Sequence, residues 1–405
     1  MRRYWPATGA AILAVLAGSL GAPQEAPAQS DKLRVGVVVP LSGQFALGGQ
    51  NVKRGYDLGA EEINAGGGIK ALGAQMELVY ADNQGKQDVA IGETERLIQQ
   101  ERVSAIMGSW HSPTTIAGTQ AAERNRTPWI VEVASADIVV ERGFKYVSRV
   151  NVKASWYGEA PVDYLDYAKK TLNQKIERVA IMYTDDDWGR SSVGKGTKNA
   201  LMQRGYQIIE EIAYPSASQD VTTYLNKIKA SRPDALVITS FPNDAILVGR
   251  TMEQLSVKVP IVIGVSAGYA LPSFIKSLGP VAERWLVVGG WNPDIPGAKA
   301  LADRYKKKFD VDMNEHAALA YQTALVLKEA VEQAKNTDRD KINEAVRALK
   351  IDPGPLMIMP YKKIEFDATG QNPHATELML QVRDGALVTV WPEQYASTKA
   401  ALPFR

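Results

Sequence analysis

The sequence predicts an α/β protein made of two open, mainly parallel sheets, each covered by helices on both faces. Apolar runs of strand length alternate with helical patterns from residue 33 onward, which is the order that parallel βαβ units require. Near residues 149–156 this alternation stops, and a second series begins. The chain of 405 residues is also longer than one hydrophobic core usually organises. We therefore expect two lobes of similar architecture.

The first series starts with a buried strand at residues 33–43, because a continuous apolar run ends there at Pro40 and Gly43. A helix follows, and three glycines at 66–68 end it. The later elements are expected as strand 76–83, helix 88–101, strand 103–110, helix 115–125 and strand 128–136.

The second series is expected as strand and loop 178–189, helix 191–205, strand 206–214, helix 221–233, strand 234–241, helix 245–255 and strand 259–268. Residues 285–293 mark another change, and helices continue to Leu349. A β-hairpin is expected around Arg383, Asp384 and Gly385. Open α/β sheets bind ligands beyond the carboxyl ends of their strands, so the loops after strands should carry the site.

The first 28 residues have the pattern of a secretory signal peptide. Arg2 and Arg3 precede an apolar stretch at 10–20, and the small residues at 26–28 predict cleavage after Ala28. The apolar stretch is shorter than the roughly 20 residues of a membrane anchor. Because the chain has no cysteine, it has no site for a lipidated cysteine. We expect an exported, cleaved and unlipidated protein.

Composition argues against several classes of protein. The loss of two arginines and Glu25 with the signal peptide lowers the formal net charge from +2 by one, so nothing favours nucleic acid or an anionic membrane as a partner. The absence of cysteine excludes disulfides and a thiol nucleophile. Three histidines far apart in the sequence do not make a zinc site, and we expect neither a metal nor a cofactor.

One segment suggests a binding site for a small anion. Hydroxyl, aromatic and imidazole side chains gather at the start of a predicted helix: Ser109, Trp110, His111, Ser112, Thr114 and Thr115. The first turn of a helix offers unpaired N–H groups and the positive end of the helix dipole, which together suit an anion. An ordinary helix cap at Ser112 is a compatible alternative.

Three segments carry a resemblance to a known family: VGVVVPLSGQFALGGQNVKRGYDLGAEEINAGGGI, GSWHSPTTIAGTQAAERNRTPWI and VERGFKYVSRV. Together they resemble the periplasmic leucine/isoleucine/valine-binding proteins, and the similarity runs from Leu33 to Pro392. The resemblance implies a type I periplasmic-binding fold and a periplasmic, monomeric solute-binding protein that closes on its ligand and delivers it to an inner-membrane ABC permease. The implied boundaries are 31–150 plus 291–373 for lobe 1, 151–290 plus 374–395 for lobe 2, and hinge crossovers near 149–153, 288–292 and 371–377.

The same resemblance implies a small carboxylate as the ligand, held by Ser112 and by groups of Ala134 and Ser135. Family members that bind α-amino acids have an acid, which pairs with the ammonium group, where this chain has Ser266. Because a buried unpaired ammonium is costly, an amino-acid ligand would need another acid. Otherwise the ligand would be an aromatic or aliphatic acid. The candidate replacements near strand ends are Glu132, Asp137, Asp185 and Asp244.

Aromatic side chains near the expected cleft either stack on the ligand or pack the hinge and loops: Trp110, Trp156, Tyr157, Trp188, Phe241, Tyr269 and Trp291. Trp188 stands in the position of a family cleft aromatic. From lobe 2 we expect Trp188, Phe241, Ser266 and Tyr269 to contact the part of the ligand beyond its carboxylate. His111 is either a polar cleft residue or a structural histidine.

Two other functions are alternatives. Residues 264–268 match G-x-S-x-G, which would make Ser266 the nucleophile of a hydrolase. His316 falls inside a helical stretch and His374 at a crossover, so neither is well placed as the base, and we expect no enzymatic activity. The other alternative is a ligand-sensing module of a receptor or regulator, against which the lack of a transmembrane segment argues. The aspartates at 185–187 lack calcium-loop spacing and are expected at a turn before a helix.

Overall fold

The structure, a computed structural model, describes Met1, Arg2, Tyr4 and residues 32–403. The signal peptide expected at residues 1–28 therefore lies outside the described residues, apart from those three positions. Among the described helices, none combines the length and the apolar character that a bilayer crossing requires.

The first sheet contains parallel strands in the order β2-β1-β3-β4-β5. These strands are β1 (Lys32–Val39), β2 (Gln75–Asp82), β3 (Ala105–Gly108), β4 (Trp129–Val131) and β5 (Val147–Arg149). They are connected by α1 (Ala46–Ala65), α2 (Gln87–Gln99), α3 (Ser112–Arg124) and the short 3-10 helix η1 (Asp137–Val139). The strand order reverses between β1 and β3, and ligands of open α/β sheets bind at such a reversal.

The second sheet has the order β14-β13-β10-β9-β8-β6-β7. Its strands are β6 (Arg178–Thr184), β7 (Gln207–Tyr214), β8 (Ala235–Ile238), β9 (Ile261–Val265), β10 (Leu286–Gly289), β13 (Leu378–Arg383) and β14 (Ala386–Trp391). The first five are parallel to one another, β13 pairs antiparallel with β10, and β13 and β14 form the antiparallel hairpin predicted around Asp384. Its helical segments are α4 (Ala154–Thr171), α5 (Asp187–Ser191), η2 (Ser192–Thr197), α6 (Lys198–Gln203), α7 (Thr222–Ser231), α8 (Pro242–Gln254), α9 (Pro272–Leu278) and η3 (Gly279–Ala282).

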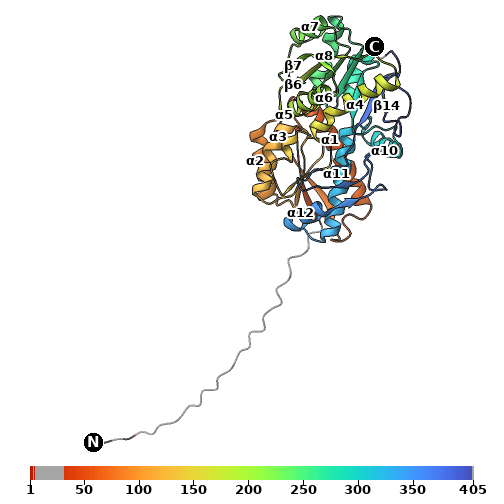
Figure 1. Cartoon of the computed structure of the whole chain (residues 1–405). Helices are drawn as coiled ribbons and strands as arrows, with labels where there is room; N and C mark the ends of the chain where they lie inside the picture. Colours follow the sequence, from red (N-terminus) through yellow and green to blue (C-terminus); the bar gives the residue numbers. More distant parts are fainter. Residues whose placement is uncertain (3, 5–31, 404–405) are drawn as a thin grey trace. The chain divides into compact units, whose positions relative to one another are not determined.

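The chain passes between the two sheets three times: after β5, after β10 and before β13. Between the second and third passages it forms α10 (Lys299–Phe309), α11 (Glu315–Ala334), α12 (Arg339–Ala348) and the small sheet of β11 (Lys350–Ile351) and β12 (Ile364–Glu365). In Figure 1, α11 and α12 lie with α1, α2 and α3, whereas α5 to α8 lie with β6 and β7. The predicted fold class, two doubly wound sheets joined by three crossovers, is confirmed.

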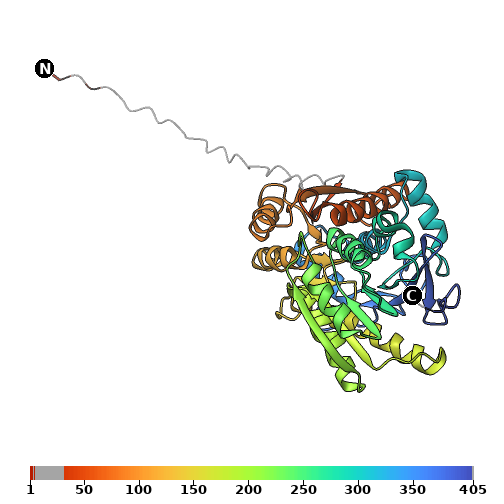
Figure 2. The same ribbon diagram turned by 90° about the horizontal axis from the view of Figure 1, so that it is seen from above.

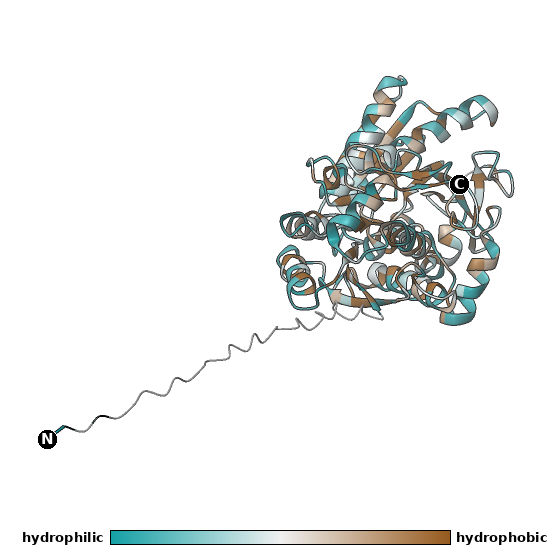
Figure 3. Ribbon diagram, turned by 90° about the horizontal axis from the view of Figure 1, so that it is seen from below, coloured by the Kyte–Doolittle hydropathy of each residue, from teal (hydrophilic) through white to brown (hydrophobic). Residues whose placement is uncertain are grey.

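Helices flank the sheets, as Figure 2 shows from a second direction. In Figure 3 the strands carry much of the brown, apolar colour, and teal is common along the helices. All residues of β8 and β9 are buried. Strands that are buried on both faces show continuous apolar runs instead of alternation, which is why these runs could be recognised in the sequence.

Two local features differ from the sequence-based expectation. The strand predicted at 128–136 has only three strand residues, β4, and is followed by an irregular segment at 132–136 that is still mostly buried. Its apolar composition therefore reflects burial without strand pairing. Strand β5 was not predicted, because three residues are too few to show a pattern.

A close contact between α1 and α11 fixes where α11 begins. A β-carbon at Gly55 on α1 would collide with the backbone carbonyl of Ala317, so glycine at this position lets the two helices approach closely. Asn314 caps α11, because its side-chain oxygen accepts a hydrogen bond from the Ala317 N–H at 3.2 Å. The first two residues of α11 are Glu315 and His316.

Candidate functional site

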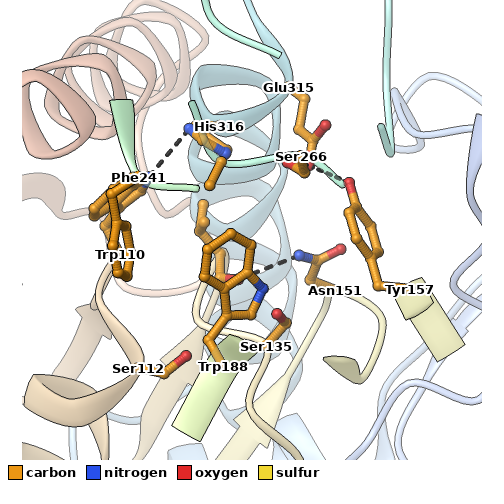
Figure 4. Close-up of a pocket in the computed structure, with 12 residues that line it drawn as sticks. Trp110, Ser112, Ser135, Asn151, Tyr157, Trp188, Phe241, Ser266, Glu315 and His316 are labelled. Atoms are coloured by element: carbon orange, nitrogen blue, oxygen red, sulfur yellow. Dashed lines mark hydrogen bonds between the residues drawn. The ribbon is translucent and has the colours of Figure 1, made fainter. Parts of the chain in front are cut away.

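A cavity lies between the two sheets, beyond the carboxyl ends of β3, β4, β6, β8 and β9 (Figure 4). Its walls also include the start of α4 and the start of α11. The lining residues are Trp110, Ser112, Val133, Ser135, Asn151, Tyr157, Trp188, Phe241, Ser266, Ala267, Glu315 and His316. The free space inside it is about 30 Å³, below the roughly 300–1,000 Å³ of most small-molecule sites.

Ser112 is the first residue of α3, and His111 is the N-cap, without a side-chain capping bond. The Ser112 hydroxyl oxygen accepts a hydrogen bond from the Ala136 N–H at 3.3 Å. Because this bond uses a lone pair and not the proton, the Ser112 O–H remains a donor at the cavity. The N–H groups of the first helical turn lie at the same end of α3, and both features suit an anion.

The segment 133–136 forms the wall beside Ser112, and we call it the cradle. The carbonyl oxygens of all four cradle residues accept hydrogen bonds from other parts of the chain. Their donors are Asn151 Nδ2 to Val133 at 3.4 Å, Arg149 Nη1 to Ala134 at 3.3 Å and to Ala136 at 2.9 Å, and Ala154 N to Ser135 at 2.7 Å. Ser135 lines the cavity, whereas Ala134 does not line it and donates its N–H to Ser109.

The other hydroxyls of this segment have hydrogen-bond partners away from the cavity and do not line it. Thr114 and Thr115 both donate to the carbonyl of His111, at 2.8 and 2.9 Å. The Ser109 hydroxyl accepts from the side chain of Asn83 at 3.0 Å. From this group of hydroxyls, Ser112 is the residue at the cavity.

Glu315 provides a carboxylate on the opposite wall. Its Oε1 accepts from the Tyr157 hydroxyl at 2.6 Å and from the Ser266 hydroxyl at 2.9 Å, and its Oε2 accepts from the Gly290 N–H at 3.0 Å. Burial raises the pKa of Glu315, while these three donors oppose the rise. Among the described residues, no lysine, arginine or histidine nitrogen lies within 4.0 Å of this carboxylate.

The four acids proposed from the sequence lie elsewhere, and none lines the cavity. Glu132 directly follows β4 and is fully buried, and this burial raises its pKa to about 8. Asp137 accepts from the Ser155 N–H, Asp185 pairs with Arg190 at 2.8 Å, and Asp244 accepts from the Ala217 N–H.

The side walls are aromatic. Phe241 lies 5.7 Å from Trp110 and 5.2 Å from Trp188 between ring centroids. Trp110 donates its Nε1–H to Nδ1 of His316 at 3.1 Å, so the neutral imidazole carries its proton on Nε2. Burial lowers the pKa of His316 to about 3, which keeps it neutral at physiological pH. The cavity therefore combines flat apolar walls with neutral donors and one carboxylate.

Seven of the ten site residues expected from the sequence line the cavity: Trp110, Ser112, Ser135, Tyr157, Trp188, Phe241 and Ser266. His111 stacks on Phe45 with ring centroids 4.2 Å apart, and Tyr269 stacks on Trp285 at 5.6 Å. Those two residues, like Ala134, do not line it. Of the other aromatics considered, Trp291 donates to the carbonyl of Ile358 and lies outside this cavity.

The serine of the G-x-S-x-G match is part of the cavity wall. Ser266 and Ala267 have left-handed backbone conformations, with φ of 31° and 41°, so the chain turns sharply after β9. The Ser266 hydroxyl donates to Glu315, and His374 instead bonds Glu365 at 2.7 Å. In the described part of the chain the serine is thus hydrogen-bonded to a carboxylate, without a histidine between them as a triad would have.

Sequence reasoning missed Val133, Asn151, Ala267, Glu315 and His316. Asn151 belongs to the first passage between the sheets, and Glu315 and His316 follow the helix cap Asn314. The cap signal of an asparagine followed by an acid was visible in the sequence. It predicts the start of a helix, but not that this start faces the strand ends.

Comparisons with known proteins agree with this fold. The model of a family described as periplasmic binding protein matches residues 32–386. Leu/Ile/Val-binding protein homolog 7 of Brucella melitensis is 29% identical over 97% of this chain and 98% of its own. The branched-chain amino acid transporter substrate-binding protein LivJ of Streptococcus pneumoniae, solved with isoleucine, is 25% identical with a TM-score of 0.76, covering 89% of this chain and 100% of its own. A solute-binding protein of an ABC transporter from Rhodopseudomonas palustris, solved with 3,4-dihydroxybenzoic acid, is 22% identical with a TM-score of 0.77, covering 92% and 98%.

Proposed function

Because the chain belongs to the periplasmic binding protein family, we propose that it captures a small α-amino acid with an apolar or aromatic side chain for import by an ABC permease of the inner membrane. The observation that carries this proposal is the buried carboxylate of Glu315 at the cavity. A buried ion without a counter-ion is strongly unfavourable. An ammonium group on the ligand would supply that counter-ion.

The opposite wall suits the carboxylate of the same ligand. Ser112 and Ser135 present hydroxyl groups there, and α3 directs the positive end of its dipole to this wall. A zwitterion would thus span the cavity, with its ammonium group at Glu315 and its carboxylate at Ser112. Its side chain would lie among Trp110, Trp188 and Phe241. The relatives named for leucine, isoleucine and valine support this ligand class.

Capture would occur by closure of two lobes about the crossovers. We assign residues 31–150 plus 291–373 to lobe 1 and 151–290 plus 374–395 to lobe 2, which follows the distribution of strands between the two sheets. Ser112, Ser135, Glu315 and His316 then belong to lobe 1, and Tyr157, Trp188, Phe241 and Ser266 belong to lobe 2. Closure would bring the two sets around the ligand in a dry site, where hydrogen bonds are stronger. The protein would act as a monomer in the periplasm after cleavage of its signal peptide.

A ligand screen on residues 29–405 tests the proposal. A ligand that binds only the folded protein raises the melting temperature. We expect shifts with leucine-like or aromatic L-amino acids, followed by saturable binding in calorimetry. Benzoates, cinnamates and branched aliphatic acids without an ammonium group form the comparison set. Shifts only with this second set would contradict the ammonium site and would make an aromatic or aliphatic acid the substrate.

The affinity for an amino acid should fall as the pH is lowered. Burial raises the pKa of Glu315 in the empty protein, and an ammonium group favours the ionised carboxylate, so ligand binding displaces the proton. Affinity is therefore full above the raised pKa and is lost as the pH falls through it. An acid without an ammonium group should show the opposite trend, because protonation removes the like charge. Calorimetric titrations of both ligands from pH 8 to pH 4 would measure how each affinity changes with pH. The same trend for both ligands would contradict the prediction.

A further inference from the structure

Arg149 lies behind the cradle and does not line the cavity. It is the last residue of β5 and is fully buried. One of its nitrogens, Nη1, donates to the carbonyls of Ala134 and Ala136, and Nε donates to Oε1 of Gln371 at 2.8 Å. These two carbonyls are on either side of Ser135, which faces the cavity. Arg149 therefore holds the cradle from behind and joins it to the third passage between the sheets.

Among the residues that the structure describes, the positive charge of Arg149 has no close acidic partner. Its hydrogen-bond acceptors are neutral, its Nη2 has no described partner, and no carboxylate oxygen of the described residues lies within 4.0 Å of it. Asp137, Glu141 and Asp367 act on it only from longer range, and Asp137 also lies 3.7 Å from Lys195. Burial lowers the pKa of Arg149 to about 10, which leaves the group charged at neutral pH. A buried charge paired only with neutral groups is costly unless another charge approaches.

We propose that Arg149 is a positioning residue that makes the cradle selective for a carboxylate over a neutral group. Its hydrogen bonds occupy the carbonyls of Ala134 and Ala136 on the side away from the cavity, so that these two acceptors do not oppose an anion there. The positive charge of Arg149 lies behind the backbone of Ser135 and favours an anion in the cavity. The cavity walls contain no lysine or arginine, so this buried group would supply the positive field for the ligand's carboxylate. This inference rests on the proposed function, because it requires a ligand that has a carboxylate.

Comparison of an acid with its amide separates this role from a purely structural one. L-Leucine and L-leucinamide share the ammonium group and the side chain and differ in the carboxylate. We expect the wild-type protein to bind leucine more tightly, and Arg149→Gln to reduce the ratio of the two affinities by about tenfold, because the substitution removes a buried positive charge that favours the ionised carboxylate. Arg149→Lys, which keeps the charge, should retain most of the ratio.

Arg142→Gln is the matched control. Arg142 also donates to backbone carbonyls, those of Ile116 and Val139, but it does not contact the cradle. The Arg142→Gln variant should leave the ratio of the leucine and leucinamide affinities unchanged. If Arg149→Gln does not fold, Gln371→Glu places a negative charge beside Nε of Arg149 and should lower the ratio in its place.

The outcomes are distinct. A wild-type ratio near one, or a variant that weakens acid and amide equally, would overturn the role of Arg149. If the wild-type protein binds benzoate but no amino acid, the proposed ammonium site is wrong. The role of Arg149 is then tested by the ratio of the benzoate and benzamide affinities. If neither acid binds, the proposed function and this inference both fail.

Discussion

Replacement of Glu315 by glutamine should weaken the binding of an α-amino acid at least about a hundredfold. Loss of one partner of a buried ion pair costs about 3–5 kcal/mol, and about 1.4 kcal/mol corresponds to a factor of ten in affinity. Glutamine has the same shape and can still accept from the hydroxyls of Tyr157 and Ser266. The loss of affinity would therefore measure the contribution of the negative charge of Glu315. Isothermal titration calorimetry with leucine would measure it.

The stability of the same variant provides an internal check. Because burial raises the pKa of Glu315, its ionised form opposes folding in the empty protein, and its removal should not lower the melting temperature at neutral pH. An acid that lacks the ammonium group should bind Glu315→Gln at least as well as the wild-type protein. Weaker binding of both ligands would indicate damage to the cavity instead.

Glu329→Gln is the control for the Glu315 variant. Glu329 lies on the same helix, pairs with Lys328 at 2.7 Å and is outside the cavity. The Glu329→Gln variant should bind leucine with the affinity of the wild-type protein. Unchanged leucine affinity in Glu315→Gln would mean that the ammonium group is bound elsewhere or that the ligand has none.

The fold could be predicted because parallel strands buried on both faces leave a strong local pattern. The apolar runs that form β8 and β9 and the turn residues at Asp384 and Gly385 are examples, since each depends on residues close in sequence. Strand β5 has three residues and no such signal. The segment 132–136 has strand-like composition but uses its carbonyls to bond Asn151 and Arg149.

The site could be predicted only in part. Ser112, Ser135 and Trp188 follow strands, and the rule that ligands bind beyond strand ends was enough to select them. The position of Glu315 depends instead on the packing of α11 against α1 at Gly55, some 260 residues away in the sequence. No local pattern reports such a contact. Tyr269 shows the opposite problem, because the sharp turn at Ser266 and Ala267 directs the chain away from the cavity within a few residues.

Replacement of Ser112 by alanine tests the other end of the ligand. The proposed hydrogen bond from its hydroxyl to a carboxylate is charge-assisted, and removal of such a bond costs about 1.5–3 kcal/mol. We expect affinity for leucine to fall about 10- to 100-fold, while affinity for leucinamide falls less. Calorimetry on both ligands would measure the difference.

The variant also removes the acceptor of the Ala136 N–H, so a small loss of stability, about 1 kcal/mol, should accompany the loss of affinity. Thr115→Ala gives a matched control, because Thr115 is on the same helix and its hydroxyl bonds the carbonyl of His111 outside the cavity. This control should lose similar stability without losing affinity. Equal affinities in Ser112→Ala and the wild-type protein would exclude the start of α3 as the carboxylate site, because no other group at the cavity combines a free hydroxyl proton with the positive end of that helix dipole.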